Sequence, residues 1–71
     1  MDWSKQELEK IEAVMKRLNE IIYITNGTSV KLDAEAEQVH FFSESGKKYK
    51  TISVAGDRPL AVAKDVLQQI D

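Results

Sequence analysis

His40 is the only side chain of this sequence that belongs to a type titrating near neutral pH, so any acid–base chemistry would start there. Catalysis also needs a nucleophile that the imidazole activates, or a carboxylate that orients it. The alternation of the surrounding strand segments places Thr51 and Lys31 beside His40, and no carboxylate at the centre of that face. The pattern favours a surface or pairing role for His40 and predicts that the protein is not an enzyme.

The sequence contains no set of side chains that is suited to bind a metal ion. Asp33, Glu35 and Glu37 recur at every second position, but no turn glycine and no further ligand completes a calcium loop. One histidine and no cysteine argue against a zinc site within one chain, and the lack of cysteine rules out disulfides. We predict a charged connection at 33–37 and no metal or other cofactor.

Four basic residues support an alternative function, the binding of nucleic acid or of a small anion. Lys47, Lys48 and Lys50 cluster near a predicted turn, and Arg58 lies beside the expected start of the last helix, where free N–H groups attract anions. Asp57 opposes an anion at that place. Lysines at such positions also protect an edge strand from pairing with another sheet. Nucleic acid is therefore the lesser alternative.

The composition predicts one small globular domain, residues 1–71, in the cytoplasm. Hydrophobic residues make up 42% and charged residues 31% of the 71 residues, and the net charge is −2. No apolar run approaches the ~20 residues of a membrane span, and the N-terminus lacks the pattern of a signal peptide. A domain of this size buries only roughly 60% of its unfolded-chain surface, so self-association as a homodimer is a plausible aid to stability.

The N-terminal segment predicts a long amphipathic helix over residues 5–24. Ser4 and Glu7 form a capping box, and Trp3 and Leu8 occupy the positions of a hydrophobic staple. Apolar residues then recur three and four positions apart on one face. This stripe consists of Leu8, Ile11, Val14, Met15, Leu18, Ile21 and Ile22.

The end of this helix has two interpretations. Residues 21–25 are rich in β-formers and precede Asn26-Gly27, a strong hairpin signal, which would make them an additional strand. Alternatively, the helix continues through Ile24 and Asn26-Gly27 caps its C-terminus. The unbroken apolar stripe through Ile22 favours the helix.

Three alternating segments and a second helix complete the predicted α+β fold. The order α-β-β-β-α gives a three-stranded antiparallel meander with both helices packed on one face; a strand at 21–25 would give α-β-β-β-β-α. Gly46 supplies the positive φ of a turn, while Asp57 and Pro59 fit the N-cap and first turn of the last helix. The apolar stripe expected for that helix consists of Leu60, Ala63, Val66, Leu67 and Ile70.

The adjacent pair Phe41-Phe42 divides the predicted sheet into two faces, because neighbouring side chains of a strand point to opposite sides. One face would pack on the helices; its members are Val30, Leu32, Val39, Phe41, Ile52 and Val54. The other face would be open to a partner protein or to a second copy. Its anchors would be Phe42 and Tyr49 as a cross-strand pair, and its polar contacts Lys31, His40 and Thr51.

The order of elements is similar to that of double-stranded RNA-binding domains, a resemblance of topology over the whole chain. That family holds phosphates with lysines at the start of its last helix, where this chain has Asp57-Arg58-Pro59. The family's first hairpin loop enters the minor groove, whereas the loop at 33–37 here is acidic and would repel phosphates. The sequence thus predicts a non-enzymatic protein-binding or accessory module of bacterial, phage or mobile-element origin.

Overall fold

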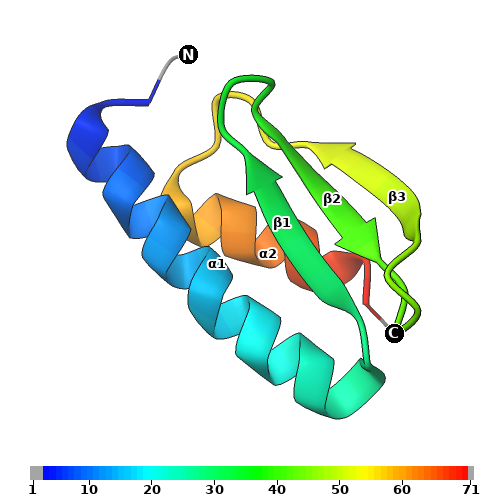
Figure 1. Ribbon diagram of the computed structural model, residues 1–71. Coiled ribbons are helices and arrows are strands. Elements are labelled where there is room, and N and C mark those ends of the chain that lie inside the picture. The colour runs from blue at the N-terminus through cyan, green and yellow to red at the C-terminus, as the bar shows by residue number, and fades with distance from the viewer. Residues whose placement is uncertain (1–2, 71) are drawn as a thin grey trace.

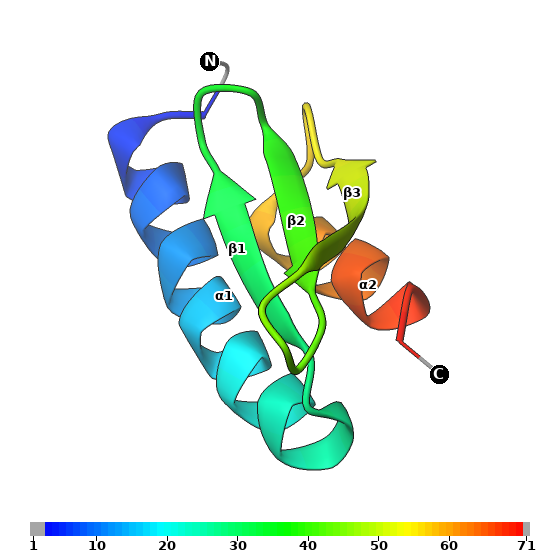
Figure 2. The same ribbon diagram turned by 45° about the vertical axis from the view of Figure 1, so that its right-hand side comes forward.

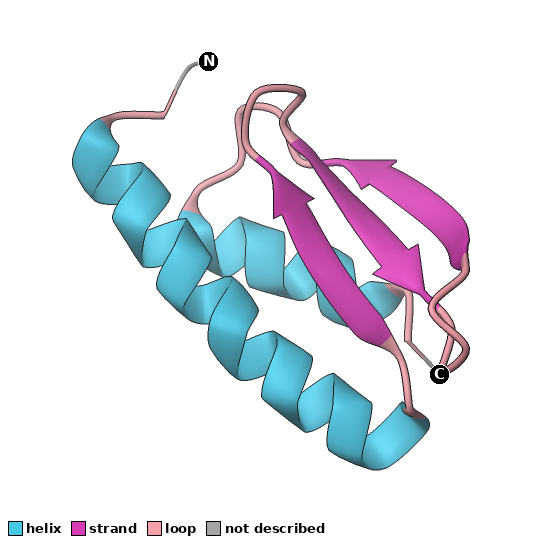
Figure 3. Ribbon diagram, viewed as in Figure 1, coloured by secondary structure: helices cyan, strands magenta, loops and turns pink. Residues whose placement is uncertain are grey.

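A computed structural model describes residues 3–70 of the chain as two helices and a three-stranded antiparallel sheet (Figure 1). The elements follow in the order α1 (Lys5–Asn26), β1 (Ser29–Asp33), β2 (Gln38–Phe42), β3 (Lys48–Ser53) and α2 (Pro59–Gln68). The strand order β1-β2-β3 is that of a meander, and α1 contacts both β1 and α2. The predicted α+β fold with the order α-β-β-β-α is confirmed, with both helices on one side of the sheet (Figures 2 and 3).

Both ends of α1 are specified by local hydrogen bonds. The Ser4 hydroxyl accepts a hydrogen bond from the backbone N–H of Glu7 at 3.1 Å, and the Glu7 carboxylate accepts one from the Ser4 N–H, which confirms the capping box. At the other end, Gly27 adopts a left-handed conformation with φ 72° and donates its N–H to the carbonyl of Tyr23. The interpretation of residues 21–25 as a strand is therefore wrong, because a glycine cap satisfies the last carbonyls of a continuous helix.

The second helix begins one residue later than the sequence suggested. Arg58, not Asp57, is the N-cap residue of α2, and no side chain caps it, while Pro59 lies in the first turn as expected. The buried face of α2 is centred on Val62 and Val66. Leu60 and Leu67 were expected in that stripe, but both are exposed, because the core lies on the Val62 side of the helix.

The register of the sheet confirms the inner face and corrects the outer one. Val39 pairs with Leu32 and Ile52, and the buried Phe41 pairs with Val30 and Lys50. A β-bulge follows, since Phe42 pairs with Lys48 and leaves Tyr49 without a partner position. The expected cross-strand pair of Phe42 with Tyr49 is therefore wrong.

The core is built by α1, β1, β2 and α2 together with Trp3 and Val54, and the partly buried Ile52 of β3 packs against it. Its buried side chains are Trp3, Ile11, Met15, Leu18, Ile22, Val30, Val39, Phe41, Val54, Val62 and Val66. The Trp3 ring is buried and its Nε1 donates a hydrogen bond to the carbonyl of Asp57 at 2.7 Å, which joins the start of α1 to the segment before α2.

Candidate binding surfaces

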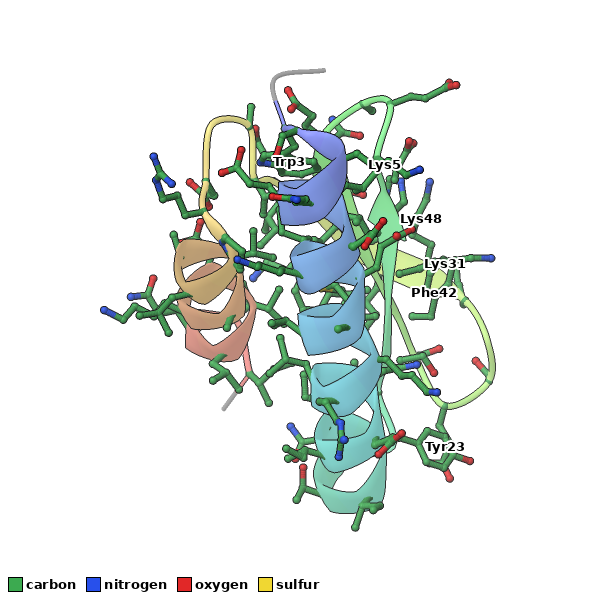
Figure 4. All side chains as sticks on the ribbon, turned by 90° about the vertical axis from the view of Figure 1, so that its left-hand side faces the viewer. Trp3, Lys5, Tyr23, Lys31, Phe42 and Lys48 are labelled. Carbon is green, nitrogen blue, oxygen red and sulfur yellow. The ribbon has the colours of Figure 1, made fainter. Side chains whose placement is uncertain are left out.

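The side of the sheet away from the helices, which we call the outer sheet face, brings together most of the predicted binding residues. Lys31 pairs with His40, and His40 pairs with Thr51, so these three residues form one row across the three strands. Phe42 lies in the next row of the same side and is half-buried. Figure 4 shows Lys31, Phe42 and Lys48 together on the side of the sheet that faces away from α2.

Hydrogen bonding fixes the position of His40 within this row. Its Nδ1 lies 2.8 Å from the Thr51 hydroxyl, and its Nε2 lies 3.7 Å from a carboxylate oxygen of Asp33. Sequence alternation placed no carboxylate at the centre of this face, but Asp33, which ends β1 two residues beyond Lys31, brings its carboxylate near the His40 imidazole. A separation of 3.7 Å exceeds a hydrogen bond, so Asp33 attracts a protonated imidazole without fixing its orientation.

The β-bulge determines which side chain of β3 lies opposite Phe42 on the outer sheet face. Lys48 stands directly opposite Phe42, and opposite residues of an antiparallel pair share a face. The Tyr49 ring lies against the buried Phe41 instead, with the ring centroids 6.4 Å apart and a tilt of 56°. Phe42 consequently stands between Ser29 and Lys48 rather than opposite a second aromatic ring, with Lys31 in the neighbouring row.

The four basic residues proposed as anion contacts do not gather at one place. Lys47 and Lys48 lie at the start of β3, and Lys50 pairs with Phe41 of the inner face. Arg58 lies beyond the opposite end of β3, where its guanidinium is 3.6 Å from the Glu7 carboxylate. An anion site therefore cannot use all four. Lys48 shares the outer sheet face with Phe42 and with Lys31, which was not among the four.

A second surface lies on the helices, where the sequence predicted only core. Four large aliphatic side chains are exposed there: Ile21 (57%), Ile24 (82%), Leu60 (68%) and Leu67 (48%). We call these four residues the helical patch. Beside it, a shallow depression of about 290 Å³ lies along α1, and its lining consists of Ala13, Val14, Arg17, Leu18 and Ile21.

Asp57, in the segment before α2, and Asp65, on α2, form an acidic pair. Burial raises the pKa of Asp57 to about 6, and hydrogen bonding and charge repulsion from Asp65 act in the same direction. One carboxylate oxygen of Asp57 is buried with no hydrogen-bond partner, which explains why the neutral form is favoured. This pair affects stability rather than forming a ligand site.

Sequence reasoning missed the helical patch because it assigned Ile21, Leu60 and Leu67 to the core. The difference in length between the two helices could have indicated that some of these apolar residues stay exposed. The 22 residues of α1 span about 33 Å and the 10 residues of α2 only about 15 Å, so α2 cannot cover every apolar position of α1.

No family model matches the chain, and no curated protein or solved structure is similar enough to count as a match. Within residues 3–70, no three side chains of the metal-binding types gather in one place. No helix within residues 3–70 is long and apolar enough to cross a membrane.

Proposed function

We propose that the protein is a small non-enzymatic accessory module of the cytoplasm that binds another protein through its helical patch. The observation that carries this proposal is the exposure of Ile21, Ile24, Leu60 and Leu67. Exposed apolar side chains favour a partner, because their burial is worth roughly 25 cal/mol per Å². The chain is small and gains little from its own core, so this surface is a substantial share of its apolar area.

The outer sheet face is the surface that sequence reasoning proposed for a partner protein or a second copy. Its polar residues Lys31, His40 and Thr51 form one row, but Phe42 is half-buried and Tyr49 lies against Phe41. Tyr49 is nevertheless 54% exposed, so this face has one large exposed aromatic side chain against the four aliphatic ones of the helical patch. It remains the proposed site for contacts of a more polar kind.

One observation favours a second candidate function for the outer sheet face, the binding of a polyanion such as single-stranded nucleic acid. The bulge places Lys48 opposite Phe42, and Lys31 lies on the neighbouring strand of the same face. An aromatic ring between ammonium groups suits a base and its phosphates. The net charge of −2 makes such binding weak.

Site-specific photo-crosslinking in cells that naturally produce the protein tests the main proposal. A benzophenone side chain replaces Ile21 or Leu67 in the helical patch, and Glu9 on the exposed side of α1 as the matched control. We expect a discrete adduct from positions 21 and 67 and none from position 9. An adduct with the mass of two copies would indicate self-association, and the absence of any adduct at positions 21 and 67 would contradict protein binding through this patch.

A further inference from the structure

We propose that the outer edge of β3 binds an extended, acidic segment of another protein, which adds a strand to the sheet. This inference goes beyond the proposed function, because it concerns a surface that is separate from the helical patch. Three features carry it: the position of β3 at the end of the sheet, the direction of its backbone groups, and the lysines that accompany them.

β3 has a neighbouring strand on one side only. The strand order is β1-β2-β3, and Figure 1 shows β3 at the end of the sheet, with no helix of the described chain along its outer edge. Within residues 3–70, β2 is the only element that β3 contacts extensively, whereas β1, at the other end of the sheet, also packs against α1. Every residue of β3 except Ile52 is exposed. The sheet therefore has one covered edge and one open edge.

The hydrogen-bond ladder indicates which backbone groups of β3 point to this open edge. In an antiparallel pair, every second residue exchanges its N–H and carbonyl bonds with the neighbouring strand, and the residues between them point away. The Val54 N–H donates to the Glu37 carbonyl at 2.9 Å, and the pairing of β2 with β3 is regular from there back to the bulge. Thr51 and Ser53 therefore direct their N–H and carbonyl groups to the open edge.

The corresponding N–H at the other edge of the sheet already has a partner. The side chain of Asn19 in α1 accepts a hydrogen bond from the Val30 N–H of β1 at 3.0 Å. Within residues 3–70, no side chain does the same for the N–H of Thr51 or Ser53. A strand edge with unpaired N–H and carbonyl groups is the surface to which extended peptides add.

Lysines determine which kind of strand this edge favours. β3 contains Lys48 and Lys50, Lys47 precedes it, and neither β3 nor β2 contains an acidic residue. Directly opposite side chains of paired strands share a face, so carboxylates of an added strand would lie beside these ammonium groups. A strand from a second copy would bring the same lysines and no carboxylate. The charges therefore oppose self-pairing and favour an acidic segment.

The regular part of the edge also specifies the side chains of the added strand. A valine opposite Ile52 would extend the apolar face, because Ile52 packs against the core. A threonine suits the position opposite the exposed Thr51, and a glutamate suits the position opposite Lys50. Since antiparallel pairing is the more stable kind, the segment that matches best is Thr-Val-Thr-Glu, running antiparallel to β3 from the position opposite Ser53.

Titration of four peptides of about eight residues into the isotope-labelled full-length protein tests the inference. The first peptide contains the matching segment with further glutamates after it, and the second has lysine in place of every glutamate. The third carries an N-methyl group on the residue opposite Thr51, which removes an N–H that would bond to β3. The fourth carries the N-methyl group on the residue opposite Ile52, where the N–H would point away from β3, and is the matched control.

We expect the second and third peptides to bind about tenfold more weakly than the first, and the fourth to bind as well as the first. Lys50→Glu should weaken the first peptide about tenfold, whereas Lys31→Glu, the same change on β1, should leave its affinity unchanged. Amide hydrogen exchange locates the contact. The first peptide should slow the exchange of the Thr51 and Ser53 N–H groups and leave that of Ile52, which faces β2, unchanged.

Three outcomes would contradict the inference. Equal binding of the first and third peptides would overturn strand addition, and equal binding of the first and second would overturn the preference for an acidic segment. Exchange at Thr51 that slows with protein concentration in the absence of peptide would show that a second copy occupies the edge instead. The crosslinking experiment on the helical patch decides the proposed function separately.

Discussion

The environment of Asp57 disfavours the negative charge of its carboxylate. Its carboxylate has a buried oxygen without a hydrogen-bond partner and a second carboxylate, Asp65, in contact. These neighbours raise the pKa of Asp57 from 3.8 to about 6. A raised pKa means that the protonated form suits the folded state, so its contribution to stability is complete below about pH 4 and is lost as the pH rises through about 6.

Asp57→Asn should therefore stabilise the protein at neutral pH. Because solvent reaches part of the side chain, we expect the free energy of unfolding to rise by about 1 kcal/mol at pH 7. The gain should vanish near pH 4, where wild-type Asp57 is already protonated in the folded state. Urea unfolding at both pH values measures this, with Glu35→Gln in the exposed turn as the control. A gain of equal size at the two pH values would show that charge is not its cause.

Trp3 contributes to stability through both its ring and its indole N–H. Trp3→Phe keeps a buried aromatic ring but removes the donor to the Asp57 carbonyl at 2.7 Å. We expect a loss of about 1 kcal/mol in the free energy of unfolding, the usual value of one such hydrogen bond. Trp3→Ala should cost about 3 kcal/mol because it also leaves a cavity. If the two variants lost the same stability, the ring would have no packing role.

At the level of elements, Gly27 is required for the passage from α1 to β1. Its φ of 72° is disfavoured for other residues, and an added Cβ would lie 3.3 Å from a carboxylate oxygen of Glu44. Gly27→Ala should lower the free energy of unfolding by about 1 kcal/mol or slightly more. Gly46→Ala is the matched control, because φ is 89° and nothing lies within 4 Å of the added Cβ. Thermal unfolding that found Gly46→Ala the more damaging would contradict a role for the contact with Glu44.

The elements themselves were predictable because their signals are local. The capping box at Ser4 and Glu7, the glycine after Asn26 and the alternation of Val39 with Phe41 each act within a few residues. The bulge was not predictable, because regular alternation after Phe41 and Lys50 places Tyr49 opposite Phe42, and no residue of 47–50 signals the extra position that brings Lys48 there. Sequence alternation therefore located the outer sheet face and misplaced one of its members.

The exposed leucines of α2 show the same limit for helices. Leu60 and Leu67 share a side of α2, as Val62 and Val66 share another, and both sides are apolar. Periodicity alone cannot state which apolar side meets the core when a short helix has two. Only the packing of α1 against α2 determines that the valines are buried and that the leucines stay exposed.

The whole molecule presents two unlike surfaces on opposite sides of one core. The outer sheet face carries Phe42 together with Lys31 and Lys48 (Figure 4), whereas the helical patch is aliphatic. We expect weak retention on a heparin column at low salt, with earlier elution of the variant Lys31→Glu with Lys48→Glu. Lys10→Glu with Lys64→Glu is the control of equal charge on the helices and should elute later than the sheet variant. Identical elution of the two variants would show that retention reflects net charge alone.

The oligomeric state follows from the same arrangement of charge. A two-fold symmetric dimer places each surface against its own copy, and lysines would then meet lysines on the outer sheet face, as Arg17 and Lys64 would meet their counterparts on the helices. Light scattering across a concentration series should accordingly give the mass of a monomer at low salt. Raising the ionic strength screens these charges and should promote association, which Ile21→Ser would prevent if the helical patch is responsible. A dimer that is stable at low salt and tolerates Ile21→Ser would contradict this expectation and support the homodimer proposed through the outer sheet face, where Phe42→Ser should then dissociate it.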